Sequence, residues 1–235
     1  MIRLGKIGAR LLYKIPSAME YVQDGLVAMW DGIENAGWGV HDPNATEWVD
    51  LTGSGNTLVR YNTSFTPSWG DNCMAFDGAM RTMKCDVTGV GANFAVEVIS
   101  LGFDFSNGYP TSFSNRLLTN DPKMIYLQRG CWNTFGAVRG SAVPENIIAA
   151  QAISVYGASL SMYNNGILDK TGAWASQYAE TVFPNHVMIG NTYQYDYSSA
   201  HFNGYIYCVR LYSRALTADE IAHNYKIDKE RFNLP

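Results

Sequence analysis

Short runs of alternating apolar and polar residues, separated by Gly, Pro, Asn and Asp, recur along this chain of 235 residues. The run at 94–100 places Phe94, Val96 and Val98 at every second position, on one face of a strand. Glu97 lies between them, and we expect it to face solvent. Similar runs predict strands at 25–31, 74–78, 124–128, 135–139, 153–155, 160–163 and 187–190.

The last predicted strand, which begins at residue 202, has an irregular pattern. Ile206 and Val209 are three residues apart, whereas one face of a regular strand repeats every two residues. If Ile206, Val209 and Leu211 all face inward, a β-bulge near Cys208 must absorb the extra residue. The Cys208 thiol is then expected to be buried and free.

A short helix is predicted directly after this strand. Thr217 and Glu220 have the spacing of a capping box, in which the Thr hydroxyl accepts from the Glu220 amide and the Glu carboxylate reaches back. Ile221 and Tyr225 share one face of that helix, and we expect this face to pack on the sheet.

Two turns are indicated by their residue types. Asn165-Gly166 suits a type I′ hairpin, so the strand at 160–163 is expected to turn back on itself. At 48–56, Asp50 and Asn56 are able to bond nearby backbone, which favours a structural turn over a binding site. A further loop is expected at 129–133, between two probable strands.

These elements, in this order, resemble the laminin-G-like domains of the concanavalin A-like lectin/glucanase superfamily. The resemblance runs from about Gly25 to Tyr225. It rests most on the terminal signature Phe202, Gly204, Ile206, Val209, Arg210-Leu211-Tyr212, Arg214-Ala215-Leu216-Thr217 and Glu220-Ile221, and on the earlier stretches 48–56, 74–78, 162–166 and 187–190.

The resemblance implies an all-β fold, a two-sheet antiparallel jelly-roll β-sandwich of the concanavalin A-like type with a short C-terminal helix. Abundant Gly and aromatic residues fit many short strands and turns. We expect a basic N-terminal arm at 1–20 and one laminin-G-like domain at 21–235.

Charge is unevenly distributed. The net charge of −4 provides no broad attraction to nucleic acid. The arm, in contrast, carries basic and apolar residues at helical spacing, and one interpretation is an arm that orders on a partner such as a capsid or tail protein. The other is a partly disordered tail or an extra edge element. The docking residues proposed for the first interpretation are Arg3, Lys6, Ile7, Arg10, Leu11 and Lys14.

Targeting and redox signals are weak. The four cysteines show no Cys-x-x-Cys pairing, which argues against a zinc ribbon. The N-terminus lacks the continuous apolar core of a secretory signal, and no stretch is long and apolar enough to span a membrane. The sequence thus predicts a protein made in the cytoplasm.

Catalytic signals are absent from the sequence. Retaining glycosidases of this superfamily place their carboxylates on one strand as Glu-x-Asp-x-(x)-Glu, with the nucleophile and the acid/base about 5–5.5 Å apart. This chain contains no Glu-x-Asp, and Glu97 stands alone, with Asp104 seven residues further on. The four histidines are dispersed. We therefore predict no enzymatic activity, no catalytic residue and no metal ligand.

Calcium is the one cofactor left open, because the resemblance implies it for some relatives. It requires 6–8 oxygen ligands, and no spacing selects among the available residues, for which turn formation is the other interpretation. Those residues are Asp42, Asn44, Asp71, Asn72, Asp77 and Asp196.

The best candidate binding site is the segment 191–201, where Tyr193, Tyr195 and Tyr197 alternate with polar residues. Tyr rings pack against the apolar faces of sugars and add a hydroxyl. The alternative is a strand extension that covers the core or a neighbouring subunit. Trp132, next to the predicted loop residues Asn133 and Thr134, is a second candidate on the same grounds.

Three hypotheses follow. The first is a non-catalytic recognition module for glycans, displayed on a phage particle or a cell surface. The second is a purely structural virion protein, a capsid decoration or fibre component anchored by its N-terminal arm. A glycoside hydrolase has the least support. Homo-oligomers are compatible with each of them.

Overall fold

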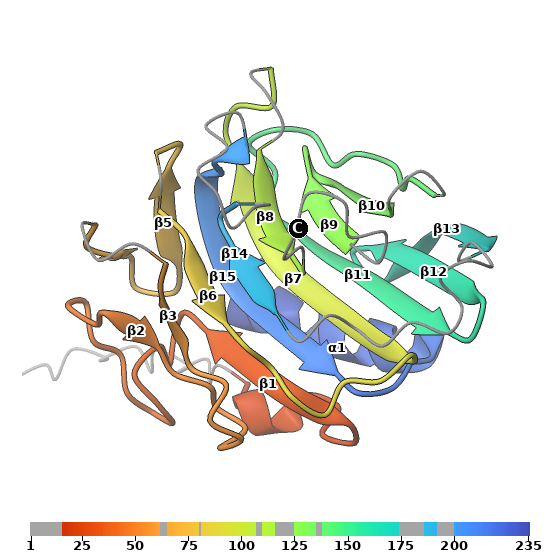
Figure 1. The fold of residues 1–235 in the computed structure, drawn as a ribbon, viewed down its shortest axis with the longest axis horizontal. Helices are drawn as coiled ribbons and strands as arrows, with labels where there is room; N and C mark the ends of the chain where they lie inside the picture. Colours follow the sequence, from red (N-terminus) through yellow and green to blue (C-terminus); the bar gives the residue numbers. More distant parts are fainter. Residues whose placement is uncertain are drawn as a thin grey trace, which may run out of the picture.

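The computed structural model describes residues 16–61, 65–79, 81–106, 110–115, 125–134, 138–173, 186–191 and 200–235. These residues form two antiparallel sheets packed face to face, with one helix behind the larger sheet (Figure 1). The all-β two-sheet sandwich with a C-terminal helix is therefore confirmed. No helix in the described ranges is long and apolar enough to cross a membrane.

The larger sheet has the order β13-β12-β11-β7-β15-β5-β4, and β1 pairs with β15 beside this path. The long strand β15 is its centre, because it pairs with β7 along most of its length, with β5 near its start and with β1 near its end. The strands are β1 (Leu26–Asp31), β4 (Ser68–Trp69), β5 (Met74–Asp77), β7 (Phe94–Gly102), β11 (Ala149–Tyr156), β12 (Ser159–Asn164), β13 (Ile167–Ala173) and β15 (Asn203–Tyr212).

The smaller sheet has the order β10-β9-β8-β14-β6-β3-β2. Its strands are short, and the sheet-to-sheet connections on both sides make a jelly-roll arrangement. The strands are β2 (Glu47–Trp48), β3 (Leu58–Arg60), β6 (Met83–Cys85), β8 (Thr111–Ser114), β9 (Ile125–Gln128), β10 (Cys131–Thr134) and β14 (Val187–Ile189).

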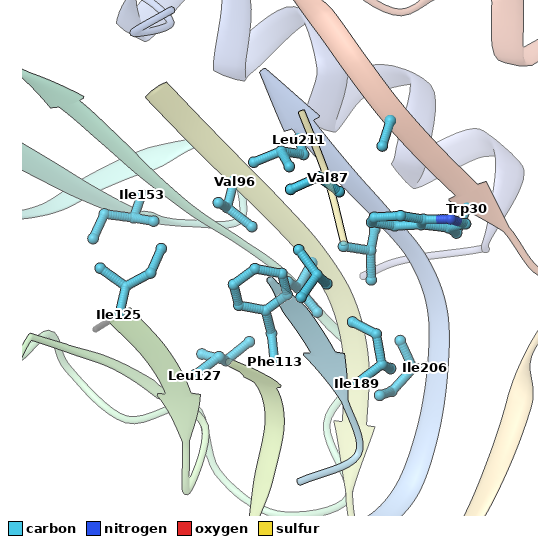
Figure 2. Close-up of a cluster of buried hydrophobic side chains, with 14 of the residues drawn as sticks. Trp30, Val87, Val96, Phe113, Ile125, Leu127, Ile153, Ile189, Ile206 and Leu211 are labelled. Atoms are coloured by element: carbon cyan, nitrogen blue, oxygen red, sulfur yellow. The ribbon is translucent and has the colours of Figure 1, made fainter. Parts of the chain in front are cut away.

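The main core lies between the two sheets (Figure 2). Val96, Ile206 and Leu211 from the larger sheet point toward Phe113 and Ile189 from the smaller one. These side chains are completely buried. Burying a residue of this size contributes about 1.5–3 kcal/mol, so the alternating positions identified in the sequence hold the sandwich together.

The other face of the larger sheet is covered by helix α1 (Ala218–Arg231) and by the N-terminal segment that contains the short helix η1 (Ala18–Glu20). Met29, Ile99 and Cys208 pack there against Ile227 and Phe232 of the C-terminal region. Strand β7 is therefore buried on both of its faces.

Several local predictions are confirmed. The register of β15 against β7 shifts between Ile206 and Cys208, which is the expected bulge, and the Cys208 thiol is free and buried. Both halves of the Thr217–Glu220 capping box are present at the start of α1. The backbone φ angles of 50° at Asn165 and 73° at Gly166 fit the predicted type I′ turn.

The predicted loop at 129–133 is wrong in its extent. Arg129 and Gly130 alone form the turn, with φ angles of 50° and 66°, and strand β10 begins at Cys131. The sequence pattern missed this because the tight two-residue turn lacks an Asn-Gly or Asp-Gly pair.

Residues 16–20, assigned to the arm from the sequence, pack on the sandwich. Ser17 and Glu20 form a capping box on η1, and Ala18 is completely buried. The Arg231 guanidinium donates to the Pro16 carbonyl, which fixes this segment to the end of α1. Residues 16–20 therefore belong to the packed body and not to the arm.

Candidate functional site

A buried network of charged and polar side chains lies between the larger sheet and α1. Arg210 on β15 is fully buried and donates from Nε to Glu97 Oε2 at 2.8 Å. Its two terminal nitrogens donate to the two oxygens of Asp228 on α1, both at 2.7 Å. Its guanidinium carbon also lies 4.0 Å from the centre of the Tyr21 ring.

Three further side chains complete this network. The Asn224 amide donates to Glu97 at 2.8 Å and to the Tyr212 hydroxyl at 3.0 Å. The Tyr21 hydroxyl donates to Asp228 at 2.7 Å. The network therefore ties two strands, the helix and the N-terminal segment together, and its role is structural.

The expectation that Glu97 faces solvent is wrong. Its side chain does point away from Val96 and Val98, but α1 covers that face and leaves Glu97 only 4% exposed. In the register of β7 and β15, Glu97 lies opposite Arg210. The positive guanidinium compensates the negative charge of the buried carboxylate. A carboxylate that is closed in by α1 and bonded to Arg210 is not placed to act as the acid of a glycosidase.

Burial dominates the electrostatics of this region. It raises the pKa of Glu97 above its ordinary value, against the opposing effect of the Arg210 guanidinium. Burial also raises the pKa of Asp31, which pairs with Arg231 at 2.8 Å. It raises the pKa of the Tyr21 hydroxyl well above its ordinary value, so Tyr21 remains a donor at neutral pH.

A solvent-open groove of about 350 Å³ lies at the other end of the larger sheet, where β15 begins beside β5. In Figure 1 this end of the two strands is at the upper left. Aromatic, small and charged residues line the groove. It is lined by Ser68, Ala75, Phe76, Asp77, Arg81, Phe103, Asn203 and Tyr205.

The aromatic part of the groove is built by Phe103 and Tyr205. Their ring centres are 5.1 Å apart in an edge-to-face arrangement, and both residues are half-buried. Tyr205 also meets Tyr207 at 6.4 Å, and Tyr207 meets Phe232 at 5.9 Å, so aromatic rings continue from the groove toward the end of α1. The Phe103–Tyr205 pair is thus one end of a row of packed aromatic rings.

The polar part of the groove is built by a cross-strand pair, Asn203 on β15 and Asp77 on β5. Directly paired residues of an antiparallel sheet point to the same face, so these two side chains lie next to each other. Arg81 Nε donates to Asp77 Oδ1 at 2.8 Å. Hydrogen-bonding groups beside apolar rings are the composition expected of a small-molecule site.

Gly204 explains how β15 fits here. Its φ angle is +151°, and a side chain at this position would collide with the Leu101 carbonyl of β7. The absence of a side chain lets the strands approach closely between Asn203 and Tyr205, whose side chains both face the groove. The glycine of the terminal signature, Gly204, is therefore a packing requirement.

The predicted site residues fall in three places. Tyr193, Tyr195 and Tyr197 lie outside the described residues, as do Arg3, Lys6, Ile7, Arg10, Leu11 and Lys14. Trp132 lies in strand β10 and not in a loop, and it is 1% exposed. Its ring packs against Phe113 in the main core, so the candidate ligand contact at Trp132 is corrected to a core residue.

No group of three or more His, Cys, Asp or Glu side chains suited to a metal occurs in the described part of the chain. Asp42 accepts from the Asn44 amide at 2.8 Å, which is a turn of the expected kind. Asp50 likewise accepts from its own loop, at Thr52 and Asn56, as the turn prediction stated. Asp196 lies outside the described residues. That the chain has no assignable metal ligand, with calcium left open, stays a prediction.

Asn203, Tyr205 and Phe103 were not singled out from the sequence. The signal that identifies them is the alternation of Asn203, Tyr205 and Tyr207 with small or apolar residues. That pattern marks an outward face of β15, but it does not show where α1 stops covering the face. The contribution of Phe103 comes from another strand end and has no local signal.

A family model described as the concanavalin A-like lectin/glucanases superfamily matches residues 94–222. No curated protein matches the sequence.

Solved structures resemble nearly all of the chain. Domain 4 of AbnA, a GH43 extracellular arabinanase from Geobacillus stearothermophilus, in complex with arabinotriose, is 18% identical with a TM-score of 0.60, over 84% of this chain and 96% of that one. A Trypanosoma rangeli sialidase is 15% identical with a TM-score of 0.65, over 92% and 34%. The ligand-binding domain of botulinum neurotoxin serotype D, in complex with N-acetylneuraminic acid, is 13% identical with a TM-score of 0.61, over 86% and 51%.

The TM-scores show a common fold, and at these low identities they show the fold alone. The chain spans almost the whole of the arabinanase domain, about a third of the sialidase and about half of the neurotoxin domain.

Proposed function

We propose that this chain, which belongs to the superfamily of concanavalin A-like lectins and glucanases, is a non-catalytic module that recognises glycans. The observation that carries the proposal is the groove at the start of β15, where the Phe103–Tyr205 ring pair lies beside Asp77 and Asn203. The arabinotriose and N-acetylneuraminic acid complexes of the similar structures are consistent with it.

The groove suits sugars because it offers both of the contacts that they need. The Tyr205 and Phe103 rings provide apolar surface for the C–H face of a sugar ring, and the Tyr hydroxyl adds a polar handle. The side chains of Asp77 and Asn203 provide hydrogen-bonding groups for hydroxyls at its edge. An open groove, in contrast to an enclosed pocket, admits one unit of a longer chain.

A recognition role fits the carboxylates of the described residues better than hydrolysis does. A retaining mechanism requires two carboxyl groups facing one cleft, about 5–5.5 Å apart. Asp77 is the one carboxylate among the groove-lining residues, and Glu97 is bonded to Arg210 beneath α1. Absence of sugar release from arabinan, xylan, starch and sialylated glycoprotein is the expected result of a hydrolysis assay.

The segment that contains Tyr193, Tyr195 and Tyr197 remains part of the proposal. It precedes Asn203 by a few residues in the chain, and Asn203 lines the groove. We propose that these tyrosines contact the same glycan as Tyr205 does.

We further propose that the module is displayed on a phage particle or a cell surface, with the basic arm as its attachment. Residues 1–15 lead directly into a segment that is fixed to the body, since Pro16 is bonded to Arg231 and Tyr21 to Asp228. A purely structural virion protein would use the same connection, and it would bind no glycan.

A glycan array tests the proposed function. The wild-type protein is expected to bind a restricted set of saccharides, and Tyr205→Ala is expected to weaken that binding about tenfold, the equivalent of about 1.4 kcal/mol. Tyr156→Ala is the matched control, because Tyr156 is 73% exposed and is not among the groove-lining residues. An empty array for the wild type would favour the purely structural role.

A further inference from the structure

The charges of the groove indicate which class of glycan it accepts. Asp77 and Arg81 are the two charged side chains among its lining residues, and they form an ion pair at 2.8 Å. The groove as a whole is therefore neutral. An anionic sugar would bring an uncompensated negative charge next to Asp77.

Arg81 is not arranged to bind a carboxylate from a ligand. Its Nε donates to Asp77, and one of its terminal nitrogens donates to the Thr66 carbonyl at 2.8 Å. Recognition of a carboxylate by Arg typically uses two parallel donors of the guanidinium fork. Here the Nε edge and a terminal nitrogen are already occupied by groups of the protein itself.

Asp77, in contrast, keeps an oxygen for a ligand. Within the described residues, Arg81 Nε and the Ala79 amide both donate to Oδ1, and Oδ2 receives neither of these bonds. The side chain of Asp77 is 52% exposed. The Arg81 hydrogen bond also lowers the pKa of Asp77, so the carboxylate remains an acceptor at mildly acidic pH.

Asn203 complements this acceptor. It is the cross-strand partner of Asp77, with an amide that offers both donors and an acceptor on the same face. Gly78 has a φ angle of +77°, and a side chain there would stand 3.5 Å from the Asn203 Cβ. Tyr205, two residues after Asn203, places its ring alongside the pair.

We propose that the groove selects neutral saccharides with two adjacent free hydroxyl groups, which bind to Asp77 and Asn203 while the sugar ring packs on Tyr205. Sugars with a carboxylate, such as uronic and sialic acids, are disfavoured. This selectivity rests on the proposed glycan-binding function and assigns the ligand class of that site.

Calorimetric titration of the full chain tests the proposal. The neutral probes are arabinotriose, maltotriose and cellotriose, and the anionic probes are sialyllactose and trigalacturonate. At least one neutral probe is expected to bind tenfold or more tightly than either anionic probe. Asp77→Asn and Asn203→Ala are each expected to weaken that binding at least tenfold.

Glu47→Gln is the matched control for the loss of one negative charge, since Glu47 is exposed on β2 in the other sheet. It is expected to bind like the wild type. An unfolding midpoint equal to that of the wild type shows that a groove variant is folded. If only one of the two variants folds, that variant alone suffices for the test.

Three outcomes would overturn the proposal. If an anionic probe binds best and Tyr205→Ala abolishes that binding, the ligand class is wrong although glycan recognition stands. The same holds if both groove variants bind like the wild type while Tyr205→Ala does not. If no saccharide binds here or on the array, glycan recognition itself fails.

Discussion

The Arg210 guanidinium and the Asp228 carboxylate meet through two parallel hydrogen bonds of 2.7 Å, and both side chains are fully enclosed. This pair joins β15 to α1, and Glu97 shares the same guanidinium from β7. The helix is therefore bound to the sheet by charge as well as by apolar contact. The groove lies beyond the part of β15 that this attachment covers.

Loss of the Arg210 side chain is expected to be severe. Arg210→Met leaves two buried carboxylates without their cation, which costs about 3–5 kcal/mol of the free energy of unfolding. Urea denaturation followed by circular dichroism measures this change. Arg81→Met, which removes the exposed ion pair with Asp77, is the control and is expected to cost about 1 kcal/mol or less. Equal effects of the two variants would contradict the structural role of the network.

The N-terminal cap of α1 is expected to make the free energy of unfolding depend on pH. Hydrogen bonds from Arg214 and the Thr217 backbone lower the pKa of Glu220 to about 2 from an ordinary value of 4.5. The native state therefore favours the ionised carboxylate, which stabilises the fold above pH 4.5 and loses this effect as the pH falls toward 2.

Glu220→Gln removes that titration. The wild type is expected to be about 1 kcal/mol more stable than the variant at neutral pH, and this difference is expected to shrink toward zero near pH 2. Denaturation curves between pH 2 and pH 7 measure it. A difference that grows on acidification would contradict the assignment.

Gly204 is expected to tolerate no side chain. Gly204→Ala must move the strand away from the Leu101 carbonyl and adopt an unfavourable φ angle, at a cost of about 1–3 kcal/mol. Gly91→Ala is the matched control, because nothing lies within 4 Å of a side chain there and its φ angle is not positive. Similar unfolding midpoints for the two variants would show that β7 and β15 are able to separate without cost.

Two truncations separate the arm from the body. Removal of residues 1–15 keeps the bonds of Pro16, Tyr21 and Val22, so the unfolding midpoint is expected to stay close to that of the wild type. Removal of residues 1–22 breaks these bonds and is expected to lower the midpoint clearly. If the protein without residues 1–15 still associates with particles or cells, the proposed anchoring by the arm is wrong.

The sequence predicted the inter-sheet core well because its residues alternate at the period of a strand. Phe94, Val96 and Val98 lie where that period places them, and the irregular spacing of Ile206 and Val209 is resolved by the predicted bulge. Local patterns of two to four residues were therefore enough to predict these strands and the bulge.

Burial that depends on distant elements could not be predicted in this way. The pattern places Glu97 opposite Val96 and Val98, which is correct, but only the packing of α1 makes that second face an interior. The loop predicted around Trp132 is wrong for a related reason. Residues 131–134 include Asn133 and Thr134, whose residue types are common in loops, and only pairing with β9 identifies the segment as a strand. The groove was missed because its walls come from separate strands.

The central claim is that the groove at the start of β15 binds glycans, and an NMR titration locates the binding surface most directly. A ¹⁵N-labelled sample is titrated with the best saccharide found by the array or by calorimetry. We expect the largest shifts at the backbone amides of Asp77, Phe103, Asn203 and Tyr205, and their loss in Tyr205→Ala. Saturable shifts confined to residues outside the groove, with these four amides unmoved, would contradict the claim.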